Sequence, residues 1–232
     1  MEPTLRKSSS SARPGASEAL GPVYAIVPAH GESNADSVAK SLSRELSEGY
    51  SLSVLLADFC SHGFRLWNSS ESPQRFDGRT WGAFVTPGDV FDTLEAREAH
   101  PRHISRLLAQ ARTRYNVTCA DLSEAKECSA LEVLRNADSI FLVANSDPRS
   151  IDQARYRAAW LRSMGLDDRT ALLLNRLGGG ANGAQAEDRT GLPVCGAVST
   201  ARDLQRLAEW LAAPLPPAFN ALALSQPALR AG

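Results

Sequence analysis

The sequence predicts a doubly wound α/β fold, in which helices cover both faces of a mostly parallel sheet. Seven short apolar runs are bounded by turn residues and lie at 23–27, 52–57, 83–86, 117–120, 140–144, 171–174 and 194–198. These runs are nearly continuously apolar, which is typical of strands that are buried on both faces. Longer segments with apolar residues at helical spacing separate them. Strands and helices that alternate over this length favour a doubly wound sheet.

The segments between the strands predict helices. They lie at 37–46, 104–115, 123–136, 150–164 and 201–211. In the first of them, Val38, Leu42 and Leu46 fall on one face. Asp147 before Pro148, and Ser199 with Thr200, predict the N-caps of the last two helices.

Composition sets the broad class of the protein. The chain has 232 residues, of which 43% are hydrophobic and 22% are charged, as in an ordinary soluble globular protein. The net charge of −1 gives no reason to expect nucleic acid or an anionic membrane as a partner. No apolar run approaches the roughly 20 residues that a membrane-spanning helix needs. We therefore expect a protein without a transmembrane segment.

The chain divides into three parts. Residues 1–21 are polar and Ser-rich, without the apolar core of a secretory signal, and predict a disordered arm. Residues 22–213 carry the α/β pattern as one domain, and residues 214–232 form a Pro- and Ala-rich tail. These features indicate a cytoplasmic protein.

The four cysteines form no C-x-x-C pair, which fits a reducing compartment. Cys60, Cys119 and Cys195 lie in or beside apolar runs and are interpreted as buried thiols. A zinc site built from Cys60, His62 and remote partners is the alternative.

A small polar loop leads from the first predicted strand into the first predicted helix. In open α/β sheets, ligands bind at the carboxyl ends of the strands, and backbone N–H groups at a helix start favour an anion. This is the position for a phosphate cradle. The candidate binding residues are Gly31, Glu32, Ser33, Asn34, Ala35, Asp36 and Ser37.

Two aspartates end apolar runs beside this loop. Asp58 ends the run VLLAD, and Asp121 ends VTCAD. Two carboxylates at neighbouring strand ends are suited to holding Mg²⁺ and a water molecule. The structural alternative is that each aspartate caps the turn that follows it.

The order of these segments resembles the ParA/MinD superfamily of deviant Walker P-loop ATPases, and most of all its branch of bacterial tyrosine kinases and CpaE-like proteins. The resemblance spans residues 23–211. It rests on the loop and helix of SVAKSL, the strand end FVTPGD, RYNVTCADLS as a Walker B segment, NADSIFLVA, LLLNRL, and GLPVCGAVSTARDL. The resemblance implies that Asn175, in LLLNRL, contacts adenine, and that ATP with Mg²⁺ is the family's ligand.

The loop departs from the family's pattern. Aligned on the helix, Ala35 stands where the P-loop lysine belongs and Asp36 where the Mg²⁺-binding Ser or Thr belongs. Glu32, Ser33 and Asn34 stand where loop residues such as glycine are usual. A lysine would neutralise phosphate charge, whereas these carboxylates would repel it. Gly31 alone keeps the backbone freedom of such a loop.

Three functions remain open at this point. The first is a pseudo-ATPase with no expected cofactor, which keeps the fold as a scaffold for a protein partner. The second is a divergent but active Mg-ATP enzyme, with Arg65, Arg149 or a partner's arginine in place of the lysine. The third is a Rossmann-like dinucleotide oxidoreductase with Asp58 on a ribose, although the loop has no G-x-G-x-x-G.

The resemblance also bears on partners and on the process served. It implies a homodimer, or pairing with an active ParA/MinD-type relative, in polysaccharide export, pilus assembly or cellular positioning. Tyrosine autokinase activity is not expected, because residues 214–232 contain no tyrosine.

Overall fold

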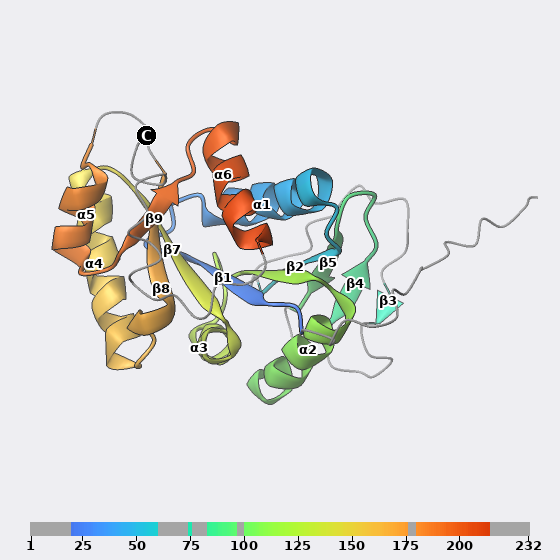
Figure 1. Cartoon of the computed structure of the whole chain (residues 1–232). Helices are drawn as coiled ribbons and strands as arrows, with labels where there is room; N and C mark the ends of the chain where they lie inside the picture. The colour runs from blue at the N-terminus through green and yellow to red at the C-terminus, as the bar shows by residue number, and fades with distance from the viewer. Residues whose placement is uncertain (1–19, 60–73, 76–82, 97–99, 176–179, 214–232) are drawn as a thin grey trace, which may run out of the picture.

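A computed structural model describes residues 20–59, 74–75, 83–96, 100–175 and 180–213. Most of the predicted arm, the whole predicted tail, and Cys60, His62 and Arg65 lie outside these residues. The described part of the chain forms one twisted sheet with helices on both sides, as Figure 1 shows. The predicted doubly wound α/β fold is confirmed.

The sheet has nine strands in its described residues, in the order β3-β4-β5-β2-β6-β1-β7-β8-β9. Six of these strands follow the predicted apolar runs: β1 (Val23–Pro28), β2 (Val54–Asp58), β6 (Val117–Asp121), β7 (Ser139–Asn145), β8 (Thr170–Asn175) and β9 (Val194–Ala197). They pair in parallel, and β1 lies between β6 and β7. The carboxyl ends of these strands therefore meet at one edge of the sheet.

One end of the sheet differs from the prediction. The third predicted run, at 83–86, forms β4 (Phe84–Thr86), which is antiparallel to β3 (Gln74–Arg75) and to β5 (Asp92–Glu95). The short polar strand β5 then pairs in parallel with β2. The sequence did not predict β3 or β5, because a four-residue strand such as DTLE lacks an apolar run.

The strands send alternate side chains into two hydrophobic cores. Along β1, Val23, Ala25 and Val27 join one core, and Tyr24 and Ile26 join the other. The second core is covered by α1 (Ala35–Tyr50) and α6 (Ala201–Ala212), which pack side by side (Figure 1). The first is covered by α2 (Pro101–Arg114), α3 (Glu127–Asn136), α4 (Pro148–Ser163) and α5 (Gly183–Thr190). Both faces of the sheet are thus buried.

The first residues of the helices agree with the prediction at two N-caps and differ from it elsewhere. Asp147 and Thr200 cap α4 and α6, as predicted. The predicted start of the third helix at Ser123 is wrong: α3 begins at Glu127, because residues after β6 form a turn in which Asp121 accepts the Ser123 N–H. Helix α5 was not predicted. It is short and begins at Gly183 behind a capping box between Asn182 and Gln185.

Candidate functional site

The β1–α1 loop occupies the centre of the edge where the parallel strands end. It leaves β1 at Pro28, where the Ala29 N–H donates to the Val143 carbonyl of β7 at 2.9 Å. It enters α1 through Asn34, which adopts a left-handed conformation with φ 56° and makes no side-chain cap. Ala35 is the first residue of the helix. The loop therefore stands where the sequence predicts a phosphate cradle.

The two predicted strand-end carboxylates lie side by side. Asp58 on β2 and Asp121 on β6 are direct partners in the parallel register. Asp121 is only 5% exposed, and its Oδ1 accepts the Ser123 N–H at 2.9 Å and the Ser123 hydroxyl at 2.5 Å. Asp121 therefore caps its own turn, as the structural alternative predicts, and it also lies beside Asp58 at the strand ends.

A small pocket lies between this pair and the loop, with a volume of about 170 Å³. Carboxylates dominate its lining. The residues that line it are Pro28, Gly31, Ser33, Ala35, Asp36, Asp58, Asp121, Ser123 and Glu124. None of these described lining residues carries a positive charge. We call this cavity the acidic pocket.

The charges of the acidic pocket act on Asp121. Burial raises the pKa of the Asp121 carboxyl, and the neighbouring Asp58 and Asp36 raise this pKa as well. The two hydrogen bonds from Ser123 oppose the rise. The pocket therefore disfavours further negative charge. Lys40, one turn into α1, lies 3.4 Å from Asp36, outside the pocket lining.

Ser33 contributes a second unusual feature of the acidic pocket. Its side chain is fully buried, and its Oγ finds no hydrogen-bond partner within the described part of the chain. Buried hydroxyl groups are nearly always hydrogen-bonded in native proteins. The Ser33 hydroxyl is therefore an unsatisfied polar group of the acidic pocket within the described part of the chain.

Mg²⁺ would find only part of a site here. Across the ranges that the structure describes, no three His, Cys, Asp or Glu side chains are grouped closely enough to hold a metal ion. Asp58 and Asp121 could supply two oxygen ligands, and Mg²⁺ commonly takes its remaining ligands from phosphates and water. The described side chains alone do not form a metal centre.

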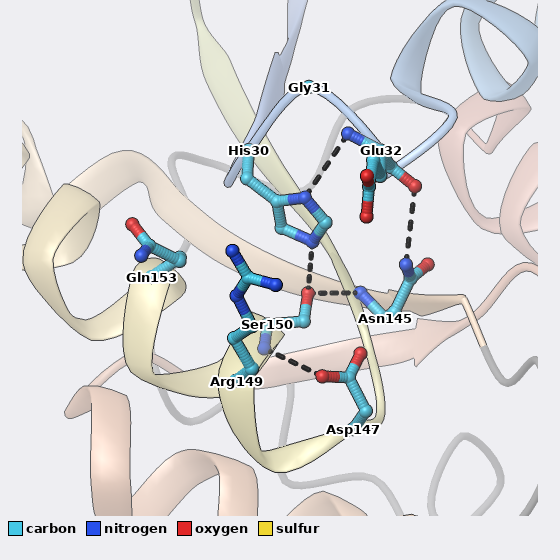
Figure 2. Close-up of a pocket in the computed structure, with 8 residues that line it drawn as sticks. All are labelled: His30, Gly31, Glu32, Asn145, Asp147, Arg149, Ser150 and Gln153. Atoms are coloured by element: carbon cyan, nitrogen blue, oxygen red, sulfur yellow. Dashed lines mark hydrogen bonds between the residues drawn. The ribbon is translucent and has the colours of Figure 1, made fainter.

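A second, larger cleft lies on the other side of the loop, with a volume of about 430 Å³. Figure 2 shows its lining, which joins the β1–α1 loop to the start of α4. The residues that line it are His30, Gly31, Glu32, Asn145, Asp147, Arg149, Ser150 and Gln153. We call this cavity the α4 cleft.

Ser150 is the hub of the α4 cleft. Its Oγ accepts the Asn145 N–H at 2.8 Å and lies 2.7 Å from His30 Nε2 (Figure 2). The Asn145 side-chain amide donates to the Glu32 carbonyl at 3.2 Å, and the Glu32 N–H donates to His30 Nδ1 at 3.1 Å. The loop is thus fastened to β7 and α4 by a closed set of hydrogen bonds.

The direction of these bonds assigns the tautomer of the neutral His30 ring. Because Nδ1 accepts the Glu32 N–H, Nδ1 carries no proton, so the neutral ring has its proton on Nε2 and donates it to Ser150. A histidine that activates a serine must instead accept the serine proton. The His30–Ser150 hydrogen bond therefore holds the loop against α4, and the two residues do not form a nucleophile with its general base.

The loop's own atoms also take up hydrogen bonds that a phosphate cradle would offer. The Glu32 N–H is used by the His30 ring, and the Ser33 N–H donates to the His30 carbonyl at 3.1 Å. Backbone N–H groups of this kind are what a phosphate cradle presents to its anion. Two of the loop's donors are therefore already engaged within the loop.

The remaining predicted site residues are dispersed. Asn175 ends β8 opposite Asn145 and is 7% exposed, and it lines neither the acidic pocket nor the α4 cleft. Asn34 and Ser37 likewise contribute no described lining to either cavity. The structure therefore gathers Gly31, Ser33, Ala35 and Asp36 with Asp58 and Asp121 around the acidic pocket, and Asn34, Ser37 and Asn175 lie outside both cavities.

Several functional residues escaped the sequence analysis. Ser123 and Glu124 line the acidic pocket, and the Asp121-x-Ser123 spacing of a short turn was a usable signal. Ser150 and Asn145 left no such signal, since Ser150 lies 120 residues from His30. His100 is exposed and caps α2 by accepting the Arg102 N–H.

The three described cysteines, Cys119, Cys128 and Cys195, line neither cavity. Cys119 and Cys195 are buried as predicted, and burial raises the pKa of each thiol to about 12. Cys128 is exposed on α3. The alternative zinc site at Cys60 and His62 lies outside the described residues.

Comparison with solved structures identifies the architecture. A ParA family ATPase from Chlorobium tepidum TLS matches with a TM-score of 0.65 and 15% identity, over 82% of this chain and 91% of that one. The septum site-determining protein MinD of Pyrococcus horikoshii OT3, complexed with Mg-ADP, matches with a TM-score of 0.66 and 16% identity, over 82% and 95%. A chain of the MinC:MinD cell division protein complex of Aquifex aeolicus matches with a TM-score of 0.63 and 15% identity, over 80% and 86%.

This chain has the ParA/MinD fold. No protein-family model and no curated protein matches its sequence. At 15% and 16% identity, few individual residues are shared with these structures. The order of strands and helices therefore indicates the ParA/MinD fold better than any single motif does. None of the described helices is both long and apolar enough to cross a bilayer.

Proposed function

We propose that the protein is a pseudo-ATPase, a ParA/MinD-fold scaffold that serves a protein partner and does not turn over ATP. One observation carries the proposal. At the site where this fold would place phosphates, α1 begins with Ala35, and the described lining of the pocket holds four carboxylates and no basic side chain.

The physical argument is electrostatic. Two like charges 4 Å apart repel by about 4 kcal/mol at an effective dielectric constant of about 20. Several carboxylates around a triphosphate would multiply this cost, whereas an ammonium at position 35 would offset it. Burial is the main cause of the raised pKa of Asp121, and the nearby carboxylates of Asp58 and Asp36 add to it.

The hydrogen bonds of the loop support the same conclusion. A phosphate-binding loop presents free backbone N–H groups to its anion. Here the Glu32 N–H donates to His30 Nδ1 and the Ser33 N–H donates to the His30 carbonyl. His30 in turn is fastened to Ser150. The loop is stabilised by its own chain in place of a nucleotide.

The structural neighbours suggest the kind of role. The Aquifex aeolicus MinD is seen with MinC, so a protein of this fold can serve a protein partner. By the resemblance, the partner here is a ParA/MinD-type relative or a second copy of this chain. The process would be polysaccharide export, pilus assembly or cellular positioning in the cytoplasm.

Thermal unfolding with and without Mg-ATP tests the proposal. A ligand at about 100 times its Kd stabilises a protein by about 2.7 kcal/mol. We expect no shift for the natural chain with ATP, ADP or GTP, with or without Mg²⁺. A Mg²⁺-dependent shift, or ATP hydrolysis that Asp121→Ala abolishes, would contradict the proposal and favour a divergent active ATPase.

Two lysine variants sharpen this test. Ala35→Lys places an ammonium at the first position of α1, so we expect it to raise affinity for Mg-ATP above that of the natural chain. Ser41→Lys adds the same charge at an exposed position of α1 away from the pocket and should leave nucleotide binding unchanged. Equal gains in both variants would mean that overall charge, and not the missing P-loop lysine, limits binding.

A further inference from the structure

Helix α4 exposes apolar side chains to an unusual degree. Among the described residues, the exposed large hydrophobic side chains are Leu20, Tyr156 and Met164. Two of these belong to α4 and its C-cap: Tyr156 is 64% exposed and Met164 is 36% exposed. Trp160 lies between them and packs partly on the core. Residues four apart share one face of a helix, so the three side chains form a continuous apolar ridge.

Arginines flank this ridge. Helix α4 contains four arginines and one acidic residue, Asp152, which pairs with Arg189 of α5 at 2.6 Å. The guanidinium carbon of Arg155 lies 5.2 Å from the centre of the Tyr156 ring, and that of Arg157 lies 5.3 Å from the Trp160 ring. Within the described part of the chain, neither arginine forms an ion pair.

Stacking on the rings prepares these arginines to bind. A guanidinium held over an aromatic face has fewer conformations to lose, and it keeps its N–H donors for a carboxylate. Arginine, tyrosine and tryptophan are also the residues that contribute most at protein interfaces. The surface therefore combines a positive rim with an apolar centre.

We infer that the α4 ridge (Tyr156, Trp160 and Met164, with Arg155 and Arg157) binds an acidic, partly apolar segment of a partner protein. This inference gives the partner's chemistry for the proposed scaffold function and rests on it. The whole chain carries a net charge of −1, so the positive charge of α4 is local and not a general property of the surface.

The chain's own ends do not fit this surface. Residues 214–232 contain no acidic residue. Residues 1–19 contain two acidic residues, Glu2 and Glu18, against three basic residues, Arg6, Lys7 and Arg13, and so carry a net charge of +1. A nucleic acid would use the arginines but would leave the apolar ridge without a partner. A separate acidic protein segment satisfies both features.

The test uses the full chain and a fluorescent synthetic peptide that repeats Glu-Leu-Asp-Phe, with a neutral Gln-Leu-Asn-Phe peptide beside it. We expect fluorescence anisotropy to show binding of the acidic peptide only. Arg155→Glu combined with Arg157→Glu should weaken binding by at least about tenfold, and Tyr156→Ala should weaken it by a similar factor.

The control reverses two exposed arginines on the other side of the sheet, Arg44→Glu on α1 and Arg202→Glu on α6, and should leave binding unchanged. Equal weakening in both pairs, or binding of duplex DNA, of phosphatidylglycerol vesicles or of a second copy of the chain in place of the peptide, overturns the inference. The peptide-binding assay contains no nucleotide, so its outcome does not depend on ATP turnover. ATP turnover in a separate assay would refute the pseudo-ATPase proposal and would leave the peptide-binding result unchanged.

Discussion

The two sides of the β1–α1 loop differ in how their polar groups are satisfied. On the α4 side, His30, Ser150 and Asn145 share a closed set of neutral hydrogen bonds. On the side of β2 and β6, carboxylates gather, the pKa of Asp121 is raised, and the Ser33 hydroxyl is buried without a described partner. The first side stabilises the loop, whereas the second carries a cost.

The two sides also differ in whether their polar groups need a partner from outside the described residues. Buried polar groups of a native protein are nearly always hydrogen-bonded, either to the protein itself or to a bound water molecule or ligand. The α4 side needs nothing further to hold the loop in place. The acidic pocket still presents the geometry of a binding site, but its charges suit a phosphate poorly. Substitutions on each side of the loop test this difference in stability.

Removing the hub of the α4 cleft should have the largest effect. Ser150→Ala deletes the acceptor of both the Asn145 N–H and the His30 Nε2–H, and Ser150 is 1% exposed. Leaving such groups unsatisfied costs about 1–3 kcal/mol. We expect a loss of that size in the free energy of unfolding, measured with urea. Ser41→Ala, exposed on α1, should change it by less than about 0.5 kcal/mol. Equal losses would show that the hub is not what holds the loop.

The contribution of Ser150 also shows what the sequence could not predict. The pairing of Asp58 with Asp121 followed from two apolar runs that end in aspartate, because parallel strands align their carboxyl ends. The contact between His30 and Ser150 depends on how a loop and a helix start meet across 120 residues. No local sequence pattern predicts that contact. The carboxylates at the strand ends could therefore be predicted from the sequence, whereas the hydrogen bonds that hold the loop could not.

Asp121→Asn should act in the opposite direction. A carboxyl whose pKa is raised in the fold contributes stability below its ordinary pKa, and this contribution is lost as the pH rises through the raised value. At pH 7 the ionised Asp121 therefore costs stability. The amide removes that charge and can still accept both bonds from Ser123. We expect urea unfolding to show a gain at pH 7 that disappears below the ordinary pKa of aspartate, about 4.

The control for this substitution lies outside the pocket. Asp138 pairs with Arg112 at 2.6 Å and accepts the Val23 N–H at 2.7 Å. Asp138→Asn should lower the free energy of unfolding at pH 7 by up to about 1 kcal/mol, because it loses a partly exposed ion pair. If the free energy of unfolding fell in both variants, other groups would have to offset the charges of the acidic pocket. The ionised Asp121 would then not cost stability.

Ser33→Ala should have a small effect that separates two states of the pocket. The Ser33 Oγ has no described partner, so its removal should leave the free energy of unfolding unchanged or raise it by up to about 1 kcal/mol. Ser150→Ala is the matched comparison, since both hydroxyls are buried but only that of Ser150 is engaged. A clear loss of stability in Ser33→Ala, by urea unfolding, would reveal a bound polar group or water that completes the pocket.

The smallest effect is expected at Gly31, which lines both cavities. An added Cβ there would meet nothing within 4 Å, and the left-handed glycines of the described chain are Gly165 and Gly191. The loop therefore does not need the backbone freedom that the sequence predicted at Gly31, and Gly31→Ala should change the free energy of unfolding by less than about 0.5 kcal/mol. Gly191→Ala, at φ 66° with Arg162 Nη2 2.8 Å from the new Cβ, should cost about 1–2 kcal/mol and is the matched control. If Gly31→Ala proved as costly as Gly191→Ala, the loop would adopt a different conformation in solution, one that requires glycine as a phosphate cradle does, and the contrast between its two sides would fail.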